Sequence, residues 1–93
     1  MKIRYTGPAA RQLDAILAYI KARSPDGDAN VLSRIDETLS IAAEQTRIGQ
    51  LTSRPGFRRI VINPYPYVIL YRARAEDIVV HSVRHAARRP RGR

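Results

Sequence analysis

The sequence contains no cysteine and no tryptophan, and only 5 of its 93 residues are glycine. Without cysteine the chain cannot form a disulfide framework, a thiolate metal site or a cysteine nucleophile. No segment approaches the roughly 20 consecutive apolar residues of a membrane span, and no apolar stretch of a secretory signal follows the charged N-terminal residues. We therefore expect a single cytoplasmic domain with no membrane association.

Motifs for metal and nucleotide chemistry are also missing. The glycines are isolated from one another, so neither a P-loop nor a dinucleotide fingerprint is present, and no Ser-His-Asp pattern is supported. Imidazole ligands could come only from His81 and His85, and the only carboxylates near them in sequence are Glu76 and Asp77. We expect no metal and no cofactor.

Acidic residues are scarce in the second half of the chain. Residues 1–46 carry six basic and six acidic side chains, whereas residues 47–93 carry eleven basic side chains and only two acidic ones. The whole net charge of +9 therefore lies in the second half. Such one-sided charge favours a polyanionic partner, either nucleic acid or an acidic protein segment. A merely well-solvated surface stays open as the alternative.

Two amphipathic helices are predicted in the first half, after a short strand over residues 2–6. Thr6 can cap the first helix, and the segment from Ser24 to Gly27 ends it because proline is excluded from a helix interior. Asp28 can cap the second helix, which extends to Gln45 or Thr46. The apolar positions at helical spacing are Ala9, Leu13, Ile16, Leu17 and Ile20 in the first helix and Val31, Leu32, Ile35, Leu39, Ala42 and Ala43 in the second.

The second half reads as a loop followed by three strands. We expect a loop over 47–56, strands over 57–62, 67–74 and 78–83 joined by tight turns, and a basic tail from Arg84, occupying about 85–93. The order β-α-α-β-β-β predicts an α+β fold, in which an N-terminal helical hairpin packs on a small, mostly antiparallel sheet. The consecutive apolar residues 68–70 predict a central strand covered on both faces. The other sheet face, built from the basic half, should be uncovered by helices.

Metal-free chemistry on phosphate is the enzymatic possibility that remains, because arginines can stabilise transition-state charge while a His or Tyr moves the proton. Tyr67 and Tyr71 lie in an apolar strand, which is typical of core residues with a satisfied hydroxyl, and His81 lies in a pattern typical of a structural residue. Arg58 and Arg59 should point to opposite faces of their strand. The candidate residues for such chemistry are Arg58, Arg59, Arg72, Arg74, Arg84, His85 and Arg88, with Tyr65, Tyr67 and Tyr71 as further donors or stacking surfaces. The candidates for binding a target are Arg58, Arg59, Arg72, Arg84, His85, Arg88 and Arg89.

The segment from Arg84 to Pro90 places His85 among guanidinium groups. Nearby positive charge favours the neutral imidazole, which can accept a proton from a hydroxyl. Alternatively, the arginines bind phosphate or carboxylate and His85 makes only local hydrogen bonds. Both interpretations stay open.

Residues 57–72 and 78–90 resemble the RelE/ParE superfamily of bacterial toxins, and the likeness extends over the whole chain, including Pro8-Ala9-Ala10 after the first strand. The most specific part is Arg84-His85-Ala86-Ala87-Arg88. The resemblance implies the toxin of a type II toxin–antitoxin system, neutralised by a partly disordered cognate antitoxin encoded beside it. An acidic, amphipathic antitoxin segment would suit the uncovered basic face.

The superfamily contains two activities, and this sequence departs from one of them. RelE-like members cut messenger RNA in the ribosome and typically carry Tyr-Arg-Leu-x-Tyr in the central strand, where this chain has Val68 after Tyr67. They also tend to end with a catalytic Tyr or His, for which this chain offers only His85. The resemblance therefore favours a ParE-like, non-enzymatic inhibitor of DNA gyrase. The alternatives are a metal-free endoribonuclease using His85, Arg84 and Arg88, and a basic binding module without toxic activity.

Overall fold

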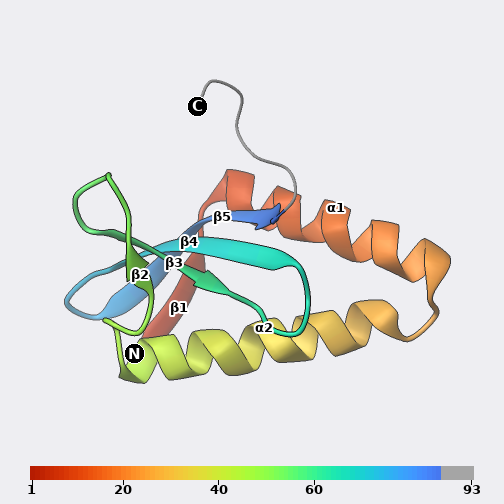
Figure 1. Ribbon diagram of the computed structural model, residues 1–93, viewed down its shortest axis with the longest axis horizontal. Coiled ribbons are helices and arrows are strands. Elements are labelled where there is room, and N and C mark those ends of the chain that lie inside the picture. The colour runs from red at the N-terminus through yellow and green to blue at the C-terminus, as the bar shows by residue number, and fades with distance from the viewer. Residues whose placement is uncertain (87–93) are drawn as a thin grey trace.

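A computed structural model describes residues 1–86 (Figure 1), so Arg88 and Arg89 lie outside the described residues. The predicted α+β class and the helical hairpin followed by strands are confirmed, with one strand that we had expected to be loop, β2. Its two residues are too few to show a period in the sequence. In chain order the elements are β1 (Lys2–Tyr5), α1 (Gly7–Arg23), α2 (Gly27–Glu44), β2 (Gln50–Leu51), β3 (Phe57–Val61), β4 (Tyr67–Ala73) and β5 (Asp77–His85).

The helix ends follow from local sequence. The Thr6 hydroxyl caps α1 by accepting a hydrogen bond from the Ala9 amide at 3.2 Å, as predicted, and a proline lies in the first turn. The prediction that Asp28 caps α2 is wrong: α2 begins at Gly27, and its N-cap is Asp26, two residues before the predicted cap. Asp28 lies instead in the first turn, where its carboxylate suits the positive end of the helix dipole.

The five strands form one sheet in the order β1-β5-β4-β3-β2. β1 pairs with β5 in parallel and the other three pairings are antiparallel, so the sheet is mostly antiparallel, as predicted. β4 is central, but the expectation that both of its faces are covered is only half right. Tyr67, Ile69 and Tyr71 are buried, whereas Val68 and Leu70 remain partly exposed. The helices cover one face only.

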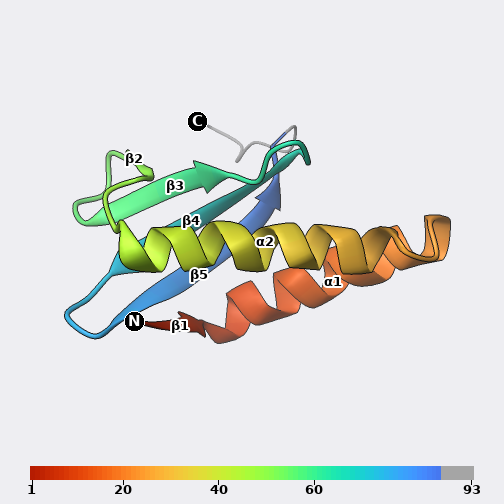
Figure 2. The ribbon, with the colours of Figure 1, turned by 90° about the horizontal axis from the view of Figure 1, so that it is seen from below.

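Both helices contribute to a single core on that covered face. Figure 2 shows α2 crossing in front of β4 and β5, with α1 beside it. A hydrogen bond between residues far apart in sequence also connects α2 with the β3–β4 turn, where Arg34 Nε donates to the Asn63 carbonyl at 2.6 Å. The buried core residues are Ala9, Leu13, Val31, Ile35, Leu39, Ala42, Ala43, Ile62, Tyr67, Ile69, Tyr71, Ile78, Val80 and Val83.

A β-bulge interrupts the pairing of β4 with β5. Tyr71 pairs with Val80 while Leu70 pairs with Ser82, so His81 is the extra residue. As a result Val80 and Val83 both reach the core, although three positions apart, and the Val83 amide donates to Gln12 Oε1 of α1 at 2.8 Å. His81 and Ser82 are left half-exposed between them.

β5 continues past Val83, the predicted end of the last strand. Arg84 pairs with Val68 and His85 with Tyr67, so both residues belong to the strand and not to the tail in which we had placed them. The reason is the length of β4, which begins at Tyr67 and gives each of them a partner. Beyond His85, the Ala86 amide donates to the Pro66 carbonyl at 2.7 Å.

Candidate functional site: the open face of the sheet

The face of the sheet that turns away from the helices is the candidate site, and we call it the open face. Residues that are paired across neighbouring strands share a face, so the register identifies its members. It is the uncovered, basic face expected from the sequence. Its members are Lys2 and Arg4 of β1, Phe57, Arg59 and Val61 of β3, Val68, Leu70 and Arg72 of β4, and Asp77, Val79, His81, Ser82 and Arg84 of β5.

The carboxylate of Asp77 is engaged by two arginines. Arg74 donates to both of its oxygens, at 2.7 and 2.8 Å, and Arg4 Nε lies 2.9 Å from Oδ2. The hydrogen bonds from Arg74, followed by those from Arg4, hold the pKa of Asp77 below its ordinary value, although burial opposes the shift. Arg59, Arg72 and Arg84 take part in no ion pair within residues 1–86. The open face therefore keeps an excess of positive charge.

Arg58 and Arg59 point to opposite faces of β3, as predicted. Arg58 is opposite Tyr71 on the covered side, and its Nη1 donates to the carbonyls of Arg47 and Gly49, at 3.3 and 2.8 Å. It thereby fixes the segment before β2. Arg59 is exposed on the open face. Of this pair only Arg59 can contact a partner on that face.

Arg84 and His85 also point to opposite faces, because they are consecutive in β5. The His85 ring packs edge-on against Tyr67 on the covered side, with ring centroids 5.5 Å apart. Arg84 lies on the open face beside Val68, which is paired in turn with Val61. The structure therefore does not bring the imidazole of His85 and the guanidinium of Arg84 to one side of the sheet.

His81, not singled out as a functional residue, is the imidazole on the open face. Its ring stands edge-on to Phe57 at 4.8 Å between centroids, and the guanidinium carbons of Arg54 and Arg72 lie 4.0 and 5.6 Å from the centre of that Phe57 ring. Partial burial, followed by the charges of Arg54 and Arg72, lowers the pKa of His81. We call these four residues the Phe57 cluster. The β-bulge aims His81 into it, which strand alternation alone cannot reveal.

Of the tyrosines offered as further donors, Tyr67 and Tyr71 are core residues, as their apolar strand predicts. Tyr71 and Tyr67 are buried in the core, and the Tyr71 hydroxyl donates to the Thr46 carbonyl and accepts from the Gly49 amide, both at 3.0 Å. Tyr65 is half-buried and packs against the same core. None of the three is on the open face.

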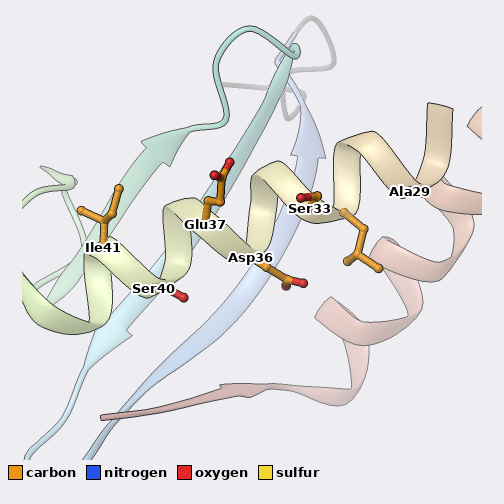
Figure 3. Close-up of a pocket in the computed structure, with 7 residues that line it drawn as sticks. Ala29, Ser33, Asp36, Glu37, Ser40 and Ile41 are labelled. Atoms are coloured by element: carbon orange, nitrogen blue, oxygen red, sulfur yellow. The ribbon is translucent and has the colours of Figure 1, made fainter. Parts of the chain in front are cut away.

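A groove of about 680 Å³ runs along the outer side of α2 (Figure 3). Two carboxylates, Asp36 and Glu37, line it, so it would repel a nucleic acid. The remaining lining residues are Ala29, Leu32, Ser33, Ser40 and Ile41. Residues 1–86 contain no cluster of three or more metal-ligating side chains. In that part of the chain, no helix is long and apolar enough to cross a membrane.

A helical hairpin over one face of a small sheet, with the other face open and basic, is the architecture that the resemblance to bacterial toxins implied. The sequence of this chain matches the family model of ParE toxins of the type II toxin–antitoxin system parDE over residues 3–90. A protein of Sinorhizobium fredii (strain NBRC 101917 / NGR234), named "Putative toxin Y4kP", is 36% identical over 85 residues, which cover 91% of this chain and 88% of that protein. The chain belongs to the ParE toxin family and is a toxin of a type II toxin–antitoxin system.

Solved structures share the fold at low sequence identity. The chromosomal ParDE system of P. aeruginosa includes a chain with TM-score 0.76 and 20% identity, covering 91% of this chain and 95% of that one. The isolated E. coli RelE toxin has TM-score 0.66 and 17% identity, with 97% and 87% covered. The E. coli DinJ-YafQ toxin–antitoxin complex has TM-score 0.60 and 14% identity, with 92% of each chain covered. The fold is therefore common to ParE and RelE toxins.

Proposed function

We propose that this toxin inhibits growth as ParE-like toxins do, by binding DNA gyrase without cleaving a substrate. The observation that supports this most directly is the row formed by Val61, Val68 and Arg84 across β3, β4 and β5. Val68 occupies the position where the RelE-like nucleases carry arginine, and its neighbour in the row is another valine. One arginine beside two valines provides little stabilisation for the charge of a phosphoryl transition state.

The position of His85 supports the same proposal. A general base must come within hydrogen-bond reach of the proton that it removes, and the arginine that stabilises the phosphate must lie close by. His85 packs against Tyr67 on the covered side, while Arg84 lies on the open face. This pair would have to rearrange in order to act on one scissile phosphate.

A RelE-like, ribosome-dependent endoribonuclease is the second candidate, and the Phe57 cluster is the observation in its favour. There a histidine whose pKa is lowered lies next to Arg54 and Arg72. A neutral imidazole could accept the proton of a ribose 2′-hydroxyl while the guanidiniums stabilise the phosphate. In that case His81 would take the role that the sequence suggested for His85.

We further propose a cognate antitoxin as the partner that neutralises the toxin. Two of the similar structures are those of a ParDE toxin–antitoxin system and of a DinJ-YafQ toxin–antitoxin complex. An acidic, amphipathic antitoxin segment would complement the open face, where Arg59, Arg72 and Arg84 lack carboxylate partners within residues 1–86.

The test is to induce the toxin in bacteria without its neighbouring antitoxin gene and to follow labelled thymidine and labelled methionine during the first minutes. Early loss of thymidine incorporation while methionine incorporation continues supports the gyrase proposal. Early loss of methionine incorporation overturns it in favour of the nuclease. No effect on growth would instead favour a binding module without toxic activity.

Two matched variants sharpen the result. Under the gyrase proposal, His81→Gln and His85→Gln both continue to stop DNA synthesis, because neither imidazole moves a proton. If His81→Gln abolishes the growth effect while His85→Gln does not, the nuclease at the Phe57 cluster is favoured. Co-expression with the antitoxin, followed by purification, checks that each variant folds.

A further inference from the structure

We propose that Arg54, Arg72 and His81, held over the ring of Phe57, form a binding site for a backbone phosphate of nucleic acid. The inference goes beyond the gyrase proposal, and it deepens the second candidate function, in which the guanidiniums of the same cluster stabilise an RNA phosphate. It rests on the packing of the Phe57 cluster, the absence of an ion pair to Arg54 or Arg72 within residues 1–86 and the distribution of arginines over the open face.

The geometry of the cluster is that of a prepared anion site. Phe57 is only 7% exposed, because the guanidinium of Arg54 lies 4.0 Å from its ring centre while Arg72 and His81 flank it. A guanidinium that packs on an aromatic ring is held in place, and its N–H groups remain available to a ligand. The ring thus orders two guanidiniums that would otherwise be free to rotate.

Two positive charges on one ring repel each other, and the protein does not neutralise them. Neither Arg54 nor Arg72 forms an ion pair with a carboxylate within residues 1–86, and both are exposed to solvent. A tetrahedral phosphate oxyanion would relieve this repulsion and could accept hydrogen bonds from both guanidiniums. The imidazole of His81 can donate one more hydrogen bond.

The distribution of arginines favours a repeating anion over a single carboxylate. On the same face, Arg59 and Arg84 lie farther along β3 and β5, and neither is in an ion pair within residues 1–86. Side chains on one face of a strand recur every two residues, about 6.6 to 6.8 Å apart. A polymer with regularly spaced phosphates can contact several such cations at once.

The same geometry predicts that bases are not read. Phe57 is covered by its neighbours, so its ring cannot stack on a base. Contacts to phosphate alone give binding that depends strongly on salt and little on sequence. The site therefore fits nucleic acid held by its backbone, as double-stranded DNA or single-stranded RNA.

The test is fluorescence anisotropy with purified full-length toxin and two labelled probes of mixed sequence, a 20-base-pair DNA duplex and a 20-nucleotide RNA. The cluster variant Arg54→Gln/Arg72→Gln is compared with the control Arg11→Gln/Arg23→Gln. The control removes the same charge from α1, and its Arg23 also packs on an aromatic ring, 3.7 Å from the centre of Tyr19. Circular dichroism checks the folding of both.

We expect the cluster variant to bind at least about tenfold more weakly than wild type to whichever probe wild type binds more tightly. The slope of log affinity against log salt should become smaller in magnitude by about 1 to 2. The control should change affinity less than about threefold, because its charges are not in the site. The probe that binds more tightly identifies the source of the phosphate. Equal losses in the two variants would overturn the proposal, since they would indicate a general charge effect.

Two further measurements keep the proposal falsifiable. One is a two-dimensional NMR titration with inorganic phosphate. We expect shifts in the Nε–H signals of Arg54 and Arg72 and in the ring signals of His81 at lower phosphate concentrations than in the Nε–H signals of the control residues Arg11 and Arg23. In the anisotropy assay, a polyglutamate peptide of equal charge should compete poorly. If the peptide competes as well as unlabelled nucleic acid, the site is one for acidic protein segments and the proposal fails. No step involves gyrase, the ribosome or growth, so failure here is distinct from failure of the proposed function.

Discussion

The backbone amide of Gly49 donates a hydrogen bond of 3.0 Å to the hydroxyl oxygen of Tyr71, which donates in turn to the Thr46 carbonyl. Tyr71 is fully buried at the centre of the sheet, so its hydroxyl connects the core to the segment that follows α2. The approach is so close that a Cβ atom on Gly49 would lie 2.6 Å from the Tyr71 oxygen. Only glycine fits there without displacing the tyrosine.

Tyr71→Phe should therefore destabilise the toxin by about 1 to 3 kcal/mol, because a buried amide and a carbonyl both lose their partner. Urea denaturation followed by circular dichroism measures the free energy of unfolding. The matched control is Tyr19→Phe on α1. Tyr19 is 56% exposed, so this substitution should change stability by less than about 0.5 kcal/mol. Equal stabilities for the two variants would show that the hydroxyl of Tyr71 is not needed.

Most of the fold was predictable because its signals are local. The capping of α1 by Thr6 and the apolar spacing of both helices depend on residues only three or four positions apart in sequence. The strand β2 was missed because Gln50 and Leu51 form no pattern by themselves and pair only once β3 is in place. The bulge at His81 was missed for a similar reason, since one extra residue in β5 is defined by its pairing with β4.

The candidate site was predictable in its location but not in its composition. The concentration of positive charge in the second half, together with the presence of only two predicted helices, predicted an open basic face. Strand alternation predicted that Arg58 and Arg59 lie on opposite faces. The sequence pattern around His81 is typical of a structural residue, because strand alternation carries no information about a bulge. Arg54 comes from the loop between β2 and β3, and only the tertiary structure places its guanidinium over Phe57.

Asp77 should make the stability of the toxin depend on acid pH. Because Arg74 and then Arg4 lower its pKa from 3.8, its contribution is fully present above that value and is lost as the pH falls through the lower, folded-state pKa. Urea unfolding between pH 6 and pH 3 should show Asp77→Asn less stable than wild type at pH 6, with the difference shrinking below about pH 4. Glu76→Gln, at the neighbouring exposed carboxylate, is the control. A difference that stays constant with pH would contradict this role.

Gly56→Ala should destabilise the toxin by about 1 to 2 kcal/mol. Gly56 has φ of 82°, a left-handed conformation that a Cβ atom disfavours. The added carbon itself would meet only the Arg72 side chain, with Nε at 3.5 Å and Cζ at 4.0 Å, so the cost comes from the backbone and not from a clash. Thermal denaturation compares it with Gly7→Ala in the first turn of α1, which should not lower the melting temperature. Equal melting temperatures for Gly56→Ala and wild type would refute the prediction.

His81 should titrate below its ordinary pKa of 6.5, and removing a neighbouring charge should raise that pKa. Partial burial contributes most to the shift and stays in place in an Arg72→Gln variant, whereas the repulsion from Arg72 is removed. The His81 midpoint should therefore move upward but not reach the value of a free histidine. The chemical shift of the His81 Cε1 proton, followed by NMR from pH 4 to pH 8, measures it, with Arg23→Gln as the charge-matched control on α1. An unchanged midpoint in Arg72→Gln would mean that the guanidinium does not act on the imidazole, and the Phe57 cluster would lose its electrostatic basis.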